Sequence, residues 1–447
     1  WTAKLPLSIL TDFEELAVYD TRKRPGENDK ASVARVQLLG FEEYLPKLEE
    51  IWNVFSKEAV YKGSFDRYAE ETLGKRGTSE VDAEFLKELE RWRDELARNI
   101  ALRNTDRDLS VDDLNFAVQA TIDRILFLRI AEGRGVESYG QLQGLTNGEE
   151  VYRRLMQLFR KADAKYNSGI FDFKTDHLTQ NLEVDDKVLR GILGNLYYPQ
   201  SPYEFSVLPP EILGNVYEQF LGKVIRLTPG GRAKVEEKPN VKKAGGVYYT
   251  PTYIVDYIVK HTVGKLCAGK SPKEMAKLRI VDPACGSGSF LLVAFQTLMD
   301  AHLAWYRDNN PKKHTKEVFL AAGAEDNNWR LSTAEKRRIL LNSIYGVDID
   351  RQAVEVTKLS LLLRVLEGEN AQTLKQHALF GERALPSLEA NVKCGNSLIG
   401  TDAFRDSLFP DPEDLRRINP FDWQTGFAEV FKAGGFDAVI GNPPYIR

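Results

Sequence analysis

The sequence predicts an α/β fold in the carboxyl-terminal part of the chain, where helices cover both faces of a parallel sheet, and a predominantly helical region before it. Two observations predict this arrangement. From about residue 247 onward, short apolar runs such as LRIVD, SIYGVDID and FDAVIG alternate with amphipathic stretches, which is typical of parallel strands joined by crossover helices. Before that point, apolar residues recur at the three- and four-residue spacing of a helix face.

The composition is that of a globular protein from a reducing compartment. Of the 447 residues, 43% are hydrophobic and 28% are charged, and this length predicts two or three domains. The three cysteines (Cys267, Cys285 and Cys394) are odd in number and scattered, which argues against a disulfide framework. No apolar run approaches the roughly 20 residues of a membrane span, so we expect a cytoplasmic protein without a membrane partner. The net charge of −4 does not exclude nucleic acid, because binding depends on a local basic face.

Residues 1–28 have strand–turn–strand character but no core of their own. Leu7, Ile9 and Leu10 precede a turn-like Thr–Asp pair, and a second apolar run follows it. The chain opens on Trp1 with no signal-peptide pattern. We therefore expect these residues to be the end of a preceding domain in a longer protein.

Residues 29–225 are predicted to form a helical domain. Ser110 stands three residues before Asp113, a pattern that predicts a helix N-terminus. One apolar stripe should follow, made of Leu114, Val118, Ile122, Ile125 and Leu126. The segment PPEILGNVYEQFLGKVI repeats the helical spacing and has Pro210 in its first turn.

A basic segment follows, and residues 226–246 are predicted to be a linker or hairpin between domains. Over 223–246 the chain has seven Lys or Arg residues against two Glu. A solvated connection explains this composition, and an element that contacts phosphates explains it equally well. Residues 247–447 form the predicted α/β domain.

A glycine-rich turn follows the first predicted strand of this domain, in LRIVDPACGSGSF. Gly286 and Gly288 allow the backbone to approach a ligand closely, and the next helix offers unpaired N–H groups. The dinucleotide fingerprint would need Gly at position 291, where the chain has Leu291, and the Gly–Lys–Ser/Thr of a phosphate loop is absent. The Pro–Cys–x–x–Cys motif of deaminases is also absent here, because position 288 is Gly and not Cys. A simple tight turn remains the alternative.

Polar residues also end the next two predicted strands. Asp348 and Asp350 end SIYGVDID, where a carboxylate can accept the hydroxyls of a ribose. Such an acid usually lies about 20 residues beyond the glycines, and a charged helical excursion over 305–340 would account for the longer distance here. A helix cap or turn is the structural alternative for Asp348. Asn396, after NVKC, could bind an adenine edge or serve as a turn residue.

Two further segments combine rigid backbone with polar side chains. Thr250 and Pro251 precede an amphipathic stretch, and a capping Thr followed by Pro in the first turn is a sufficient structural explanation. The strand FDAVIG ends in Asn442, two prolines and Tyr445. Prolines stop the sheet ladder and fix the backbone, so the side-chain oxygen of Asn442 and the carbonyl of Pro443 become fixed acceptors. Such acceptors can hold a planar amino group, while Tyr445 offers a face on which a base stacks.

These motifs together resemble a known family. The chain reads TP at 250–251, DPACGSGSF at 282–290, GVDID at 346–350, GNSL at 395–398 and NPPY at 442–445. In this order they resemble the amino-group DNA methyltransferases that use S-adenosylmethionine, in particular the gamma class of N6-adenine enzymes. The segments LTDFEELAVYD, IDRILFLRIAEGRG, PPEILGNVYEQFLG, VKKAGGVYYTP and GGFDAVIGNPPYIR further resemble the single-chain type IIG restriction–modification enzymes.

The resemblance implies a Rossmann-like S-adenosylmethionine-dependent methyltransferase fold, incomplete in this chain, and a role for each motif residue. The residues implied to hold the methionine part of the cofactor are Thr250, Asp282, Ala284, Gly286 and Gly288. Asp348 would accept the ribose hydroxyls, Ile349 would pack on the adenine ring and Asn396 would meet its edge. The implied catalytic residues are Asn442, Pro443, Pro444 and Tyr445. Relatives often have Glu at position 348 and Asp at position 396.

The resemblance also implies the partner and the remaining architecture. Duplex DNA is the expected partner, and one adenine should rotate out of the helix into the site. We expect a monomer. The family places a nuclease before the helical region and a target-recognition domain after the sheet, so Mg²⁺ would serve only a nuclease part outside this chain, and no metal is assigned here.

Three rival interpretations stay open from the sequence. A glutamine-directed protein methyltransferase shares the NPPY tip, because a side-chain amide also presents an NH2 group. A standalone phage-exclusion adenine methyltransferase would have the same motifs without a nuclease. The third interpretation is a DNA-binding scaffold that keeps the methyltransferase fold but has lost catalysis.

Overall fold

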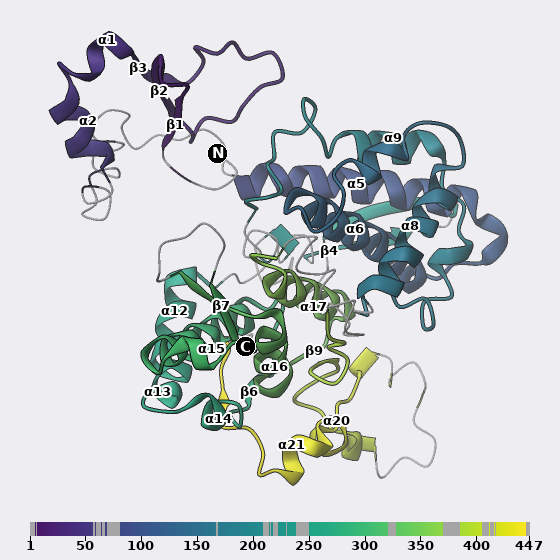
Figure 1. The fold of residues 1–447 in the computed structure, drawn as a ribbon. Coiled ribbons are helices and arrows are strands. Elements are labelled where there is room, and N and C mark those ends of the chain that lie inside the picture. The colour runs from purple at the N-terminus through teal and green to yellow at the C-terminus, as the bar shows by residue number, and fades with distance from the viewer. Residues whose placement is uncertain are drawn as a thin grey trace.

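The computed structural model describes most of the chain. The described residues are 5, 7–56, 59, 64, 68, 81–166, 169–208, 214, 216–217, 222–228, 230–237, 250–320, 328–369, 385–404, 411, 415 and 417–443. Figure 1 shows three parts: a small amino-terminal sheet with short helices, a helical part, and a carboxyl-terminal part with a parallel sheet.

The amino-terminal part is a three-stranded antiparallel sheet in the order β1-β2-β3. Its strands are β1 (Leu7–Thr11), β2 (Glu15–Asp20) and β3 (Arg35–Gly40), and the helices α1 (Phe41–Tyr44) and α2 (Leu48–Phe55) follow. Asp12 forms the predicted turn, because its carboxylate accepts the backbone N–H groups of Glu14 and Glu15. β3 lies beyond residue 28, within the range expected to be helical, and it pairs with β2.

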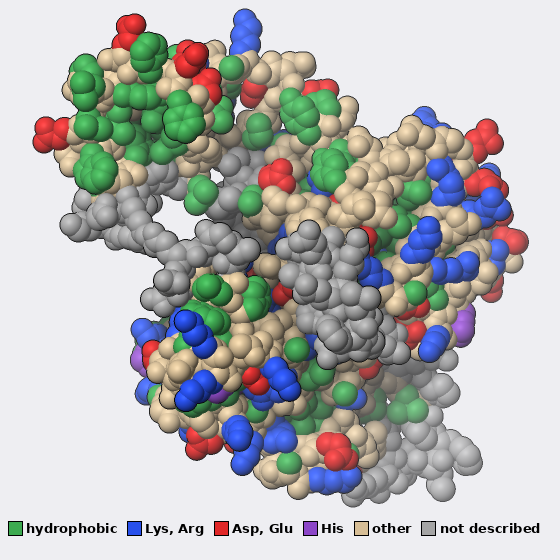
Figure 2. Space-filling view, viewed as in Figure 1, with side chains coloured by type: hydrophobic (Ala, Val, Ile, Leu, Met, Phe, Trp, Pro, Cys, Tyr) green, Lys and Arg blue, Asp and Glu red, His purple; other side chains and the backbone are tan. Residues whose placement is uncertain are grey.

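Exposed apolar side chains gather on this amino-terminal part, as Figure 2 shows. Phe13 is 85% exposed and Leu45 is 82% exposed. Leu7 and Val18 form a small buried cluster there, with Leu16, Phe55 and Tyr68 packed against them, and Ala17 and Leu39 are also buried. The part therefore has a very small core, as its sequence indicated.

The helical part is built around two long helices that pack on each other, α5 (Val81–Arg103) and α6 (Val111–Gly133). The shorter elements are η1 (Thr105–Arg107), α7 (Gln141–Gly144), α8 (Val151–Tyr166), η2 (Thr179–Asn181) and α9 (Asp186–Gly194). Ser110 caps α6 as predicted, since its hydroxyl accepts the N–H of Asp113 at 3.1 Å. The predicted helix around Pro210 lies largely outside the described residues.

The basic segment begins with an antiparallel hairpin of β4 (Lys223–Leu227) and β5 (Ala233–Glu237). The hairpin packs on α5 and α6. Two of its lysines form ion pairs, Lys223 with Glu90 and Lys234 with Glu236. The hairpin is therefore anchored to the helical part, and residues 238–249 lie outside the described residues.

The carboxyl-terminal part alternates helices and strands. Its elements are α12 (Thr252–His261), α13 (Val263–Cys267), α14 (Pro272–Met275), β6 (Ile280–Asp282), α15 (Ser289–Asp308), η3 (Pro311–Lys313), β7 (Val318–Leu320), β8 (Trp329–Leu331), α16 (Thr333–Ser343), β9 (Ile344–Asp348), α17 (Arg351–Val365), β10 (Val392–Cys394), η4 (Thr401–Phe404), α20 (Trp423–Gly426), α21 (Ala428–Lys432) and β11 (Ala438–Val439). The four predicted strands β6, β9, β10 and β11 are all present. The excursion over 305–340 is not purely helical, because β7 and β8 pair as a short antiparallel hairpin within it.

The four strands form one parallel sheet in the order β10-β9-β6-β11. The chain starts at β6, adds β9 and β10 on one side, and then returns to place β11 on the other side of β6. The direction of strand addition reverses at β6. Ligands of open parallel sheets bind outside the carboxyl ends of the strands at such a reversal.

The two faces of the sheet are covered by different helices. On one face, Gly346 of β9 lies against Leu291 of α15, and an added Cβ there would come within 2.8 Å of its Cδ1. On the other face, Val347 joins an aromatic cluster with Phe421, Phe427 and partly buried neighbours from α20 and α21. Alternate side chains of β9 thus point to opposite faces, as the period of a strand requires.

A continuous hydrophobic core joins the helical part to the sheet. Buried residues of α5, α6, α15, α17 and the strands belong to one cluster, and α6 packs directly on α17. Arg134, at the end of α6, donates to the carbonyl of Leu363 in α17 at 3.0 Å. Among the described residues, none of the helices is long and apolar enough to cross a membrane.

Candidate active site

The loops that carry the predicted site residues meet at one edge of the parallel sheet. Asp282 is the last residue of β6, Asp348 the last of β9 and Cys394 the last of β10, and Gly441 and Asn442 follow β11. Because all four strands run in the same direction, their carboxyl ends lie at the same edge. The sheet therefore brings together motifs that are up to 192 residues apart in the sequence.

The glycine turn after β6 has the backbone shape that only glycine adopts readily. Gly286 and Gly288 have φ values of 54° and 88°, in the left-handed region where a Cβ is strained. A Cβ on Gly288 would also come within 2.9 Å of the methyl group of Thr357. Helix α15 begins directly after Gly288. Glycine at position 288 thus lets the turn pack closely on α17 at the N-terminus of α15.

Asp282 joins the glycine turn to the tip after β11. It is 1% exposed, and its Oδ1 accepts the N–H of Ala284 at 3.0 Å. Gly441 lies so close that a Cβ built on it would come within 2.6 Å of the same oxygen. The two loops therefore touch at Asp282, on the two strands that flank the reversal in strand order.

Asp348 ties the glycine turn to β9. Its Oδ2 accepts the N–H of Gly286 and its Oδ1 accepts the N–H of Asp350, both at 2.8 Å. The cap of helix α17 is Asp350, whose side chain accepts from Gln352. Asp348 is therefore not the helix cap that the structural alternative supposed, although it does shape the local turn. The side chain of Ile349, next to it, is 53% exposed.

Asn396 lies in a turn beyond β10. Its Oδ1 accepts the N–H of Leu398 at 3.1 Å, which is the turn role considered from the sequence. Its own N–H donates to the carbonyl of Asn419 at 2.6 Å. Asn419 also reaches the carbonyl of Ile349 with its amide, at 3.4 Å. Asn419 thus connects the ends of β9 and β10.

Thr250 and Asn442 are in direct contact. The Nδ2 of Asn442 donates to the Oγ1 of Thr250 at 3.1 Å. The structural explanation offered for Thr250 was wrong, because Pro251 is the N-cap of α12 and no side-chain cap bond is made there. Pro443 is described, whereas Pro444 and Tyr445 lie outside the described residues.

Two residues at the site were missed in the sequence. Thr357, fully buried on α17, donates from its hydroxyl to the carbonyl of Gly286 at 2.8 Å. Asn419 has a positive φ of 48°, and the Asn–Pro pair it forms with Pro420 was a signal for such a turn. Thr357 gave no signal, because a Thr within a helix is unremarkable until its neighbour in space is known.

Cys285, inside the glycine turn, is a packing residue. It is 4% exposed, and its Sγ lies 3.1 Å from the position of a Cβ on Gly346. Burial, with a smaller effect of the nearby carboxylates of Asp348 and Asp282, raises the pKa of its thiol well above the ordinary value. A thiol with a raised pKa is a poor nucleophile at neutral pH.

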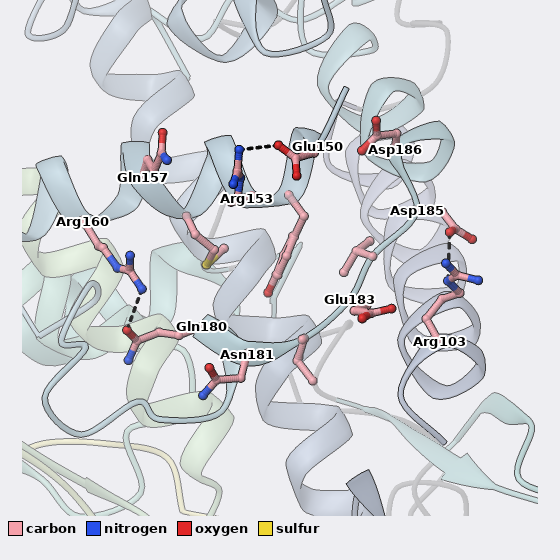
Figure 3. Close-up of a pocket in the computed structure, with 14 residues that line it drawn as sticks. Arg103, Glu150, Arg153, Gln157, Arg160, Gln180, Asn181, Glu183, Asp185 and Asp186 are labelled. Carbon is pink, nitrogen blue, oxygen red and sulfur yellow. Dashed lines mark hydrogen bonds and ion pairs between the residues drawn. The ribbon is translucent and has the colours of Figure 1, made fainter. Parts of the chain in front are cut away.

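A separate pocket lies in the helical part, and its lining residues are distant in sequence from these motifs (Figure 3). Its volume is about 550 Å³, and residues between 103 and 186 line it. Its arginines are paired: Arg103 with Asp185, Arg153 with Glu150, and Arg160 with the side-chain oxygen of Gln180. None of the predicted site residues lines it. No group of three or more His, Cys, Asp or Glu side chains suited to a metal occurs among the described residues.

The carboxyl-terminal half of the chain matches two family models. Residues 209–391 match the N-6 DNA Methylase family, and residues 342–447 match the Eco57I restriction-modification methylase family. The two matches overlap across β9 and α17, so together they cover the sheet and every motif described above.

Curated relatives include restriction enzymes fused to methyltransferases. The chain is 35% identical over 447 residues to the type II restriction enzyme and methyltransferase RM.Eco57I of Escherichia coli, covering all of this chain and 42% of that protein. It is 26% identical over 361 residues to a putative type II restriction enzyme and methyltransferase of Methanocaldococcus jannaschii, covering 65% of this chain and 28% of that protein. The chain thus spans less than half the length of either relative.

Solved structures similar to this one include two protein–DNA complexes. The type IIL enzyme MmeI in complex with DNA matches with a TM-score of 0.39 and 17% identity, over 72% of this chain and 41% of that chain. The DrdV–DNA complex matches with a TM-score of 0.38 and 14% identity, over 99% of this chain and 34% of that chain.

Proposed function

Because the chain belongs to the N6-adenine DNA methylases of restriction–modification systems, we propose that it transfers a methyl group from S-adenosylmethionine to the N6 amino group of adenine in duplex DNA. The observation that carries this proposal is the contact between the loop after β6 and the tip after β11. Asp282 lies against Gly441, so the proposed cofactor loop and the proposed amine clamp are adjacent.

The residues at the sheet edge fit S-adenosylmethionine. A side chain on Gly288 would collide with Thr357, so the close packing of the turn on α17 depends on glycine. At the end of β9, a carboxylate fixed by two backbone donors stands beside a half-exposed apolar side chain, Ile349. A carboxylate can accept about four hydrogen bonds, so Asp348 can also accept ribose hydroxyls.

Each part of the cofactor would meet a different strand end. The methionine part would lie on the turn formed by Ala284, Gly286 and Gly288, with Asp282 and Thr250 beside it. The ribose would bind Asp348, and Ile349 would pack on the adenine. The amide nitrogen of Asn396 can donate to a ring nitrogen of adenine, because its oxygen already accepts from Leu398. When bound, the cofactor supplies an electrophilic methyl group on a positively charged sulfur.

The tip after β11 would hold the target amine. The Oδ1 of Asn442 and the carbonyl of Pro443 are acceptors on a backbone with little freedom. An amino group held by two acceptors is turned toward the methyl donor and loses conjugation with the ring, which makes its lone pair available. Fixed acceptors in a site that excludes water favour such a transfer, because they do not have to reorganise.

DNA is the substrate class that this clamp fits. The amino group of a paired adenine is inside the duplex, so the base has to leave the stack, at a cost of a few kcal/mol. Tyr445 would stack on the extruded base, an interaction of about 1–3 kcal/mol.

We further propose that the full-length protein is a type IIG enzyme, whose nuclease and target-recognition parts lie largely outside these residues and whose nuclease alone uses Mg²⁺.

The test replaces Asn442 by alanine in the full-length protein. Asn442→Ala should reduce methyl transfer to duplex DNA by at least about 100-fold, the scale of losing an oriented polar contact, while the Kd for S-adenosylmethionine changes little. Transfer is measured with labelled cofactor and duplex DNA, and affinity by calorimetry. The matched control is Asn309→Ala, which removes an exposed asparagine at the end of α15 and should leave both values unchanged.

Other outcomes would point elsewhere. Full methyl transfer by Asn442→Ala would refute the clamp. If the unsubstituted protein labels a protein glutamine and leaves DNA unlabelled, the enzyme is a protein methyltransferase. If it binds no S-adenosylmethionine, the chain is a scaffold that keeps only the fold.

A further inference from the structure

Thr250 stands at the start of α12 without capping that helix. Pro251 occupies the N-cap position and makes no side-chain bond to the first turn. The hydroxyl of Thr250 is therefore not committed to the helix it precedes. It lies 3.1 Å from the Nδ2 of Asn442, which is 192 residues later in the sequence.

In the structure, the Asn442 amide turns its donor end toward Thr250. A primary amide has a donor end and an acceptor end, and the donor end is bound to the Thr250 hydroxyl. The acceptor end, Oδ1, then points away from Thr250. An amide rotated by 180° about its last bond would offer its NH2 group to the target amine, and two donors repel each other.

The contact also has little competition from the rest of the tip. Gly441 is pressed against Asp282 and Pro443 restricts the backbone on the other side, so the main chain places Asn442 but does not choose between its two amide orientations. Among the described residues, the Thr250 hydroxyl is the group that hydrogen-bonds to the Asn442 side chain, and it accepts from the Nδ2.

We propose that Thr250 is a positioning residue for methyl transfer, which anchors the Asn442 amide so that Oδ1 accepts from the target amine. This inference rests on the proposed function and deepens it. It gives Thr250 a role in the chemical step, beyond the role in holding the cofactor that its motif implies.

The experiment separates these two roles in the full-length protein. Thr250→Val keeps the shape of the side chain and removes the hydroxyl, whereas Thr250→Ser keeps the hydroxyl. At saturating S-adenosylmethionine, Thr250→Val should lower the single-turnover transfer rate by about 10- to 100-fold, the scale of a misplaced reacting group, and Thr250→Ser should stay within about 3-fold of the unsubstituted protein. Thr262→Val, which removes a hydroxyl bonded within α12 to the carbonyl of Ile258, is the matched control and should not change the rate.

A second background tests whether Thr250 acts through the amide. Asn442→Asp has two acceptor oxygens, so its orientation no longer matters. In that background, Thr250→Val should change the single-turnover rate by less than about 3-fold, because effects of two residues that act as a unit do not add. Equal effects of Thr250→Val in both backgrounds would overturn the proposal.

The remaining outcomes are also decisive. If Thr250→Val raises only the Kd for S-adenosylmethionine and keeps the full rate at saturation, Thr250 serves the cofactor alone and the proposal fails. If that variant does not fold, as judged by circular dichroism, Thr250→Ala replaces it with the same expected loss. An unsubstituted protein that methylates no adenine overturns the proposed function together with this inference, whereas an active protein with an indifferent Thr250 overturns only the inference.

Discussion

At the scale of single residues, the shape of the glycine turn depends on two side chains from neighbouring elements. Asp348 of β9 binds the N–H of Gly286, and Thr357 of α17 binds its carbonyl. The peptide unit before Gly286 is thus held at its N–H, and the peptide unit after it is held at its carbonyl. The turn is fixed before any ligand arrives, and such preorganisation improves affinity because less freedom is lost on binding.

Removing the Thr357 hydroxyl should weaken cofactor binding. Thr357→Val keeps the buried volume and leaves the Gly286 carbonyl without this donor, a loss of about 1 kcal/mol. We expect the Kd for S-adenosylmethionine to rise about 5- to 10-fold, while the transfer rate at saturating cofactor stays near that of the unsubstituted protein. Calorimetry and single-turnover assays measure the two quantities.

A neighbouring serine on the same helix provides the control. Ser360 is also fully buried, and its hydroxyl has no hydrogen-bond partner among the described residues. Ser360→Ala should leave the Kd unchanged. An equal rise in Kd for both variants would mean that disturbance of α17, rather than the bond to Gly286, is responsible.

The residues at this edge differ in how far the sequence could predict their surroundings. The strand ends and the glycine turn were predictable, because apolar runs and glycines determine them locally. The partner of Thr250 was not, because the capping explanation satisfied the local sequence and the actual partner lies on another strand. Thr357 was missed for the same reason: its bond depends on how α17 crosses the sheet.

At the scale of secondary-structure elements, α6 differs most from its prediction. The sequence predicted one apolar stripe, but 17 residues of α6 are buried, including polar ones such as Gln119 and Asp123. The helix is covered by α5 on one side and by α17 on another. A sequence pattern shows an apolar face, but it does not show that polar side chains on the other faces will also be buried.

Asp123 of α6 should make the stability of the protein depend on pH. Burial raises the pKa of Asp123 to about 7, although the hydrogen bonds from Tyr217 and Gln119 act to lower it. Because the folded-state pKa is raised, the folded protein binds more protons than the unfolded chain between about pH 4 and pH 7. The stability that Asp123 contributes is therefore fully present below pH 4 and is lost as the pH rises through about 7.

The variant Asp123→Asn removes this titration and keeps an acceptor for Tyr217 and Gln119. Its Tm relative to the unsubstituted protein should increase by several degrees between pH 5 and pH 8, measured by differential scanning calorimetry. Asp112→Asn, at an exposed position in the first turn of the same helix, should show no such increase. A Tm difference for Asp123→Asn that does not vary with pH would contradict the expected burial of a charged carboxylate.

At the scale of the whole molecule, the helical part and the sheet share one hydrophobic core. Arg134, at the end of α6, makes several of the polar contacts at this junction. Arg134 donates to the carbonyls of Leu363 and Leu208 and lies 3.8 Å from Glu367. The domain boundaries predicted from the sequence stay predictions, since sequence patterns identify the elements on either side but not the depth of the contact between them.

Loss of the Arg134 contacts should loosen this junction. Hydrogen bonds from a charged donor contribute about 1.5–3 kcal/mol, so in Arg134→Met the amides in the last turn of α17 should exchange about 10- to 100-fold faster. Hydrogen exchange with mass spectrometry measures this, and peptides from β1 and β2 serve as an internal reference. Arg160→Met, at the pocket of the helical part, should leave α17 unchanged, and unchanged exchange in Arg134→Met would show that apolar packing alone holds the junction.

The strand order β10-β9-β6-β11 has a consequence for how the protein folds during its synthesis on the ribosome. Asp282 and Asp348 emerge, and can fold with their helices, long before β11 has been synthesised. The pairing of β11 with β6 closes a loop of more than 150 residues, and contacts so distant in the sequence form slowly. A nascent chain should therefore form the proposed cofactor turn first, and it should gain the proposed amine clamp only when the last strand docks.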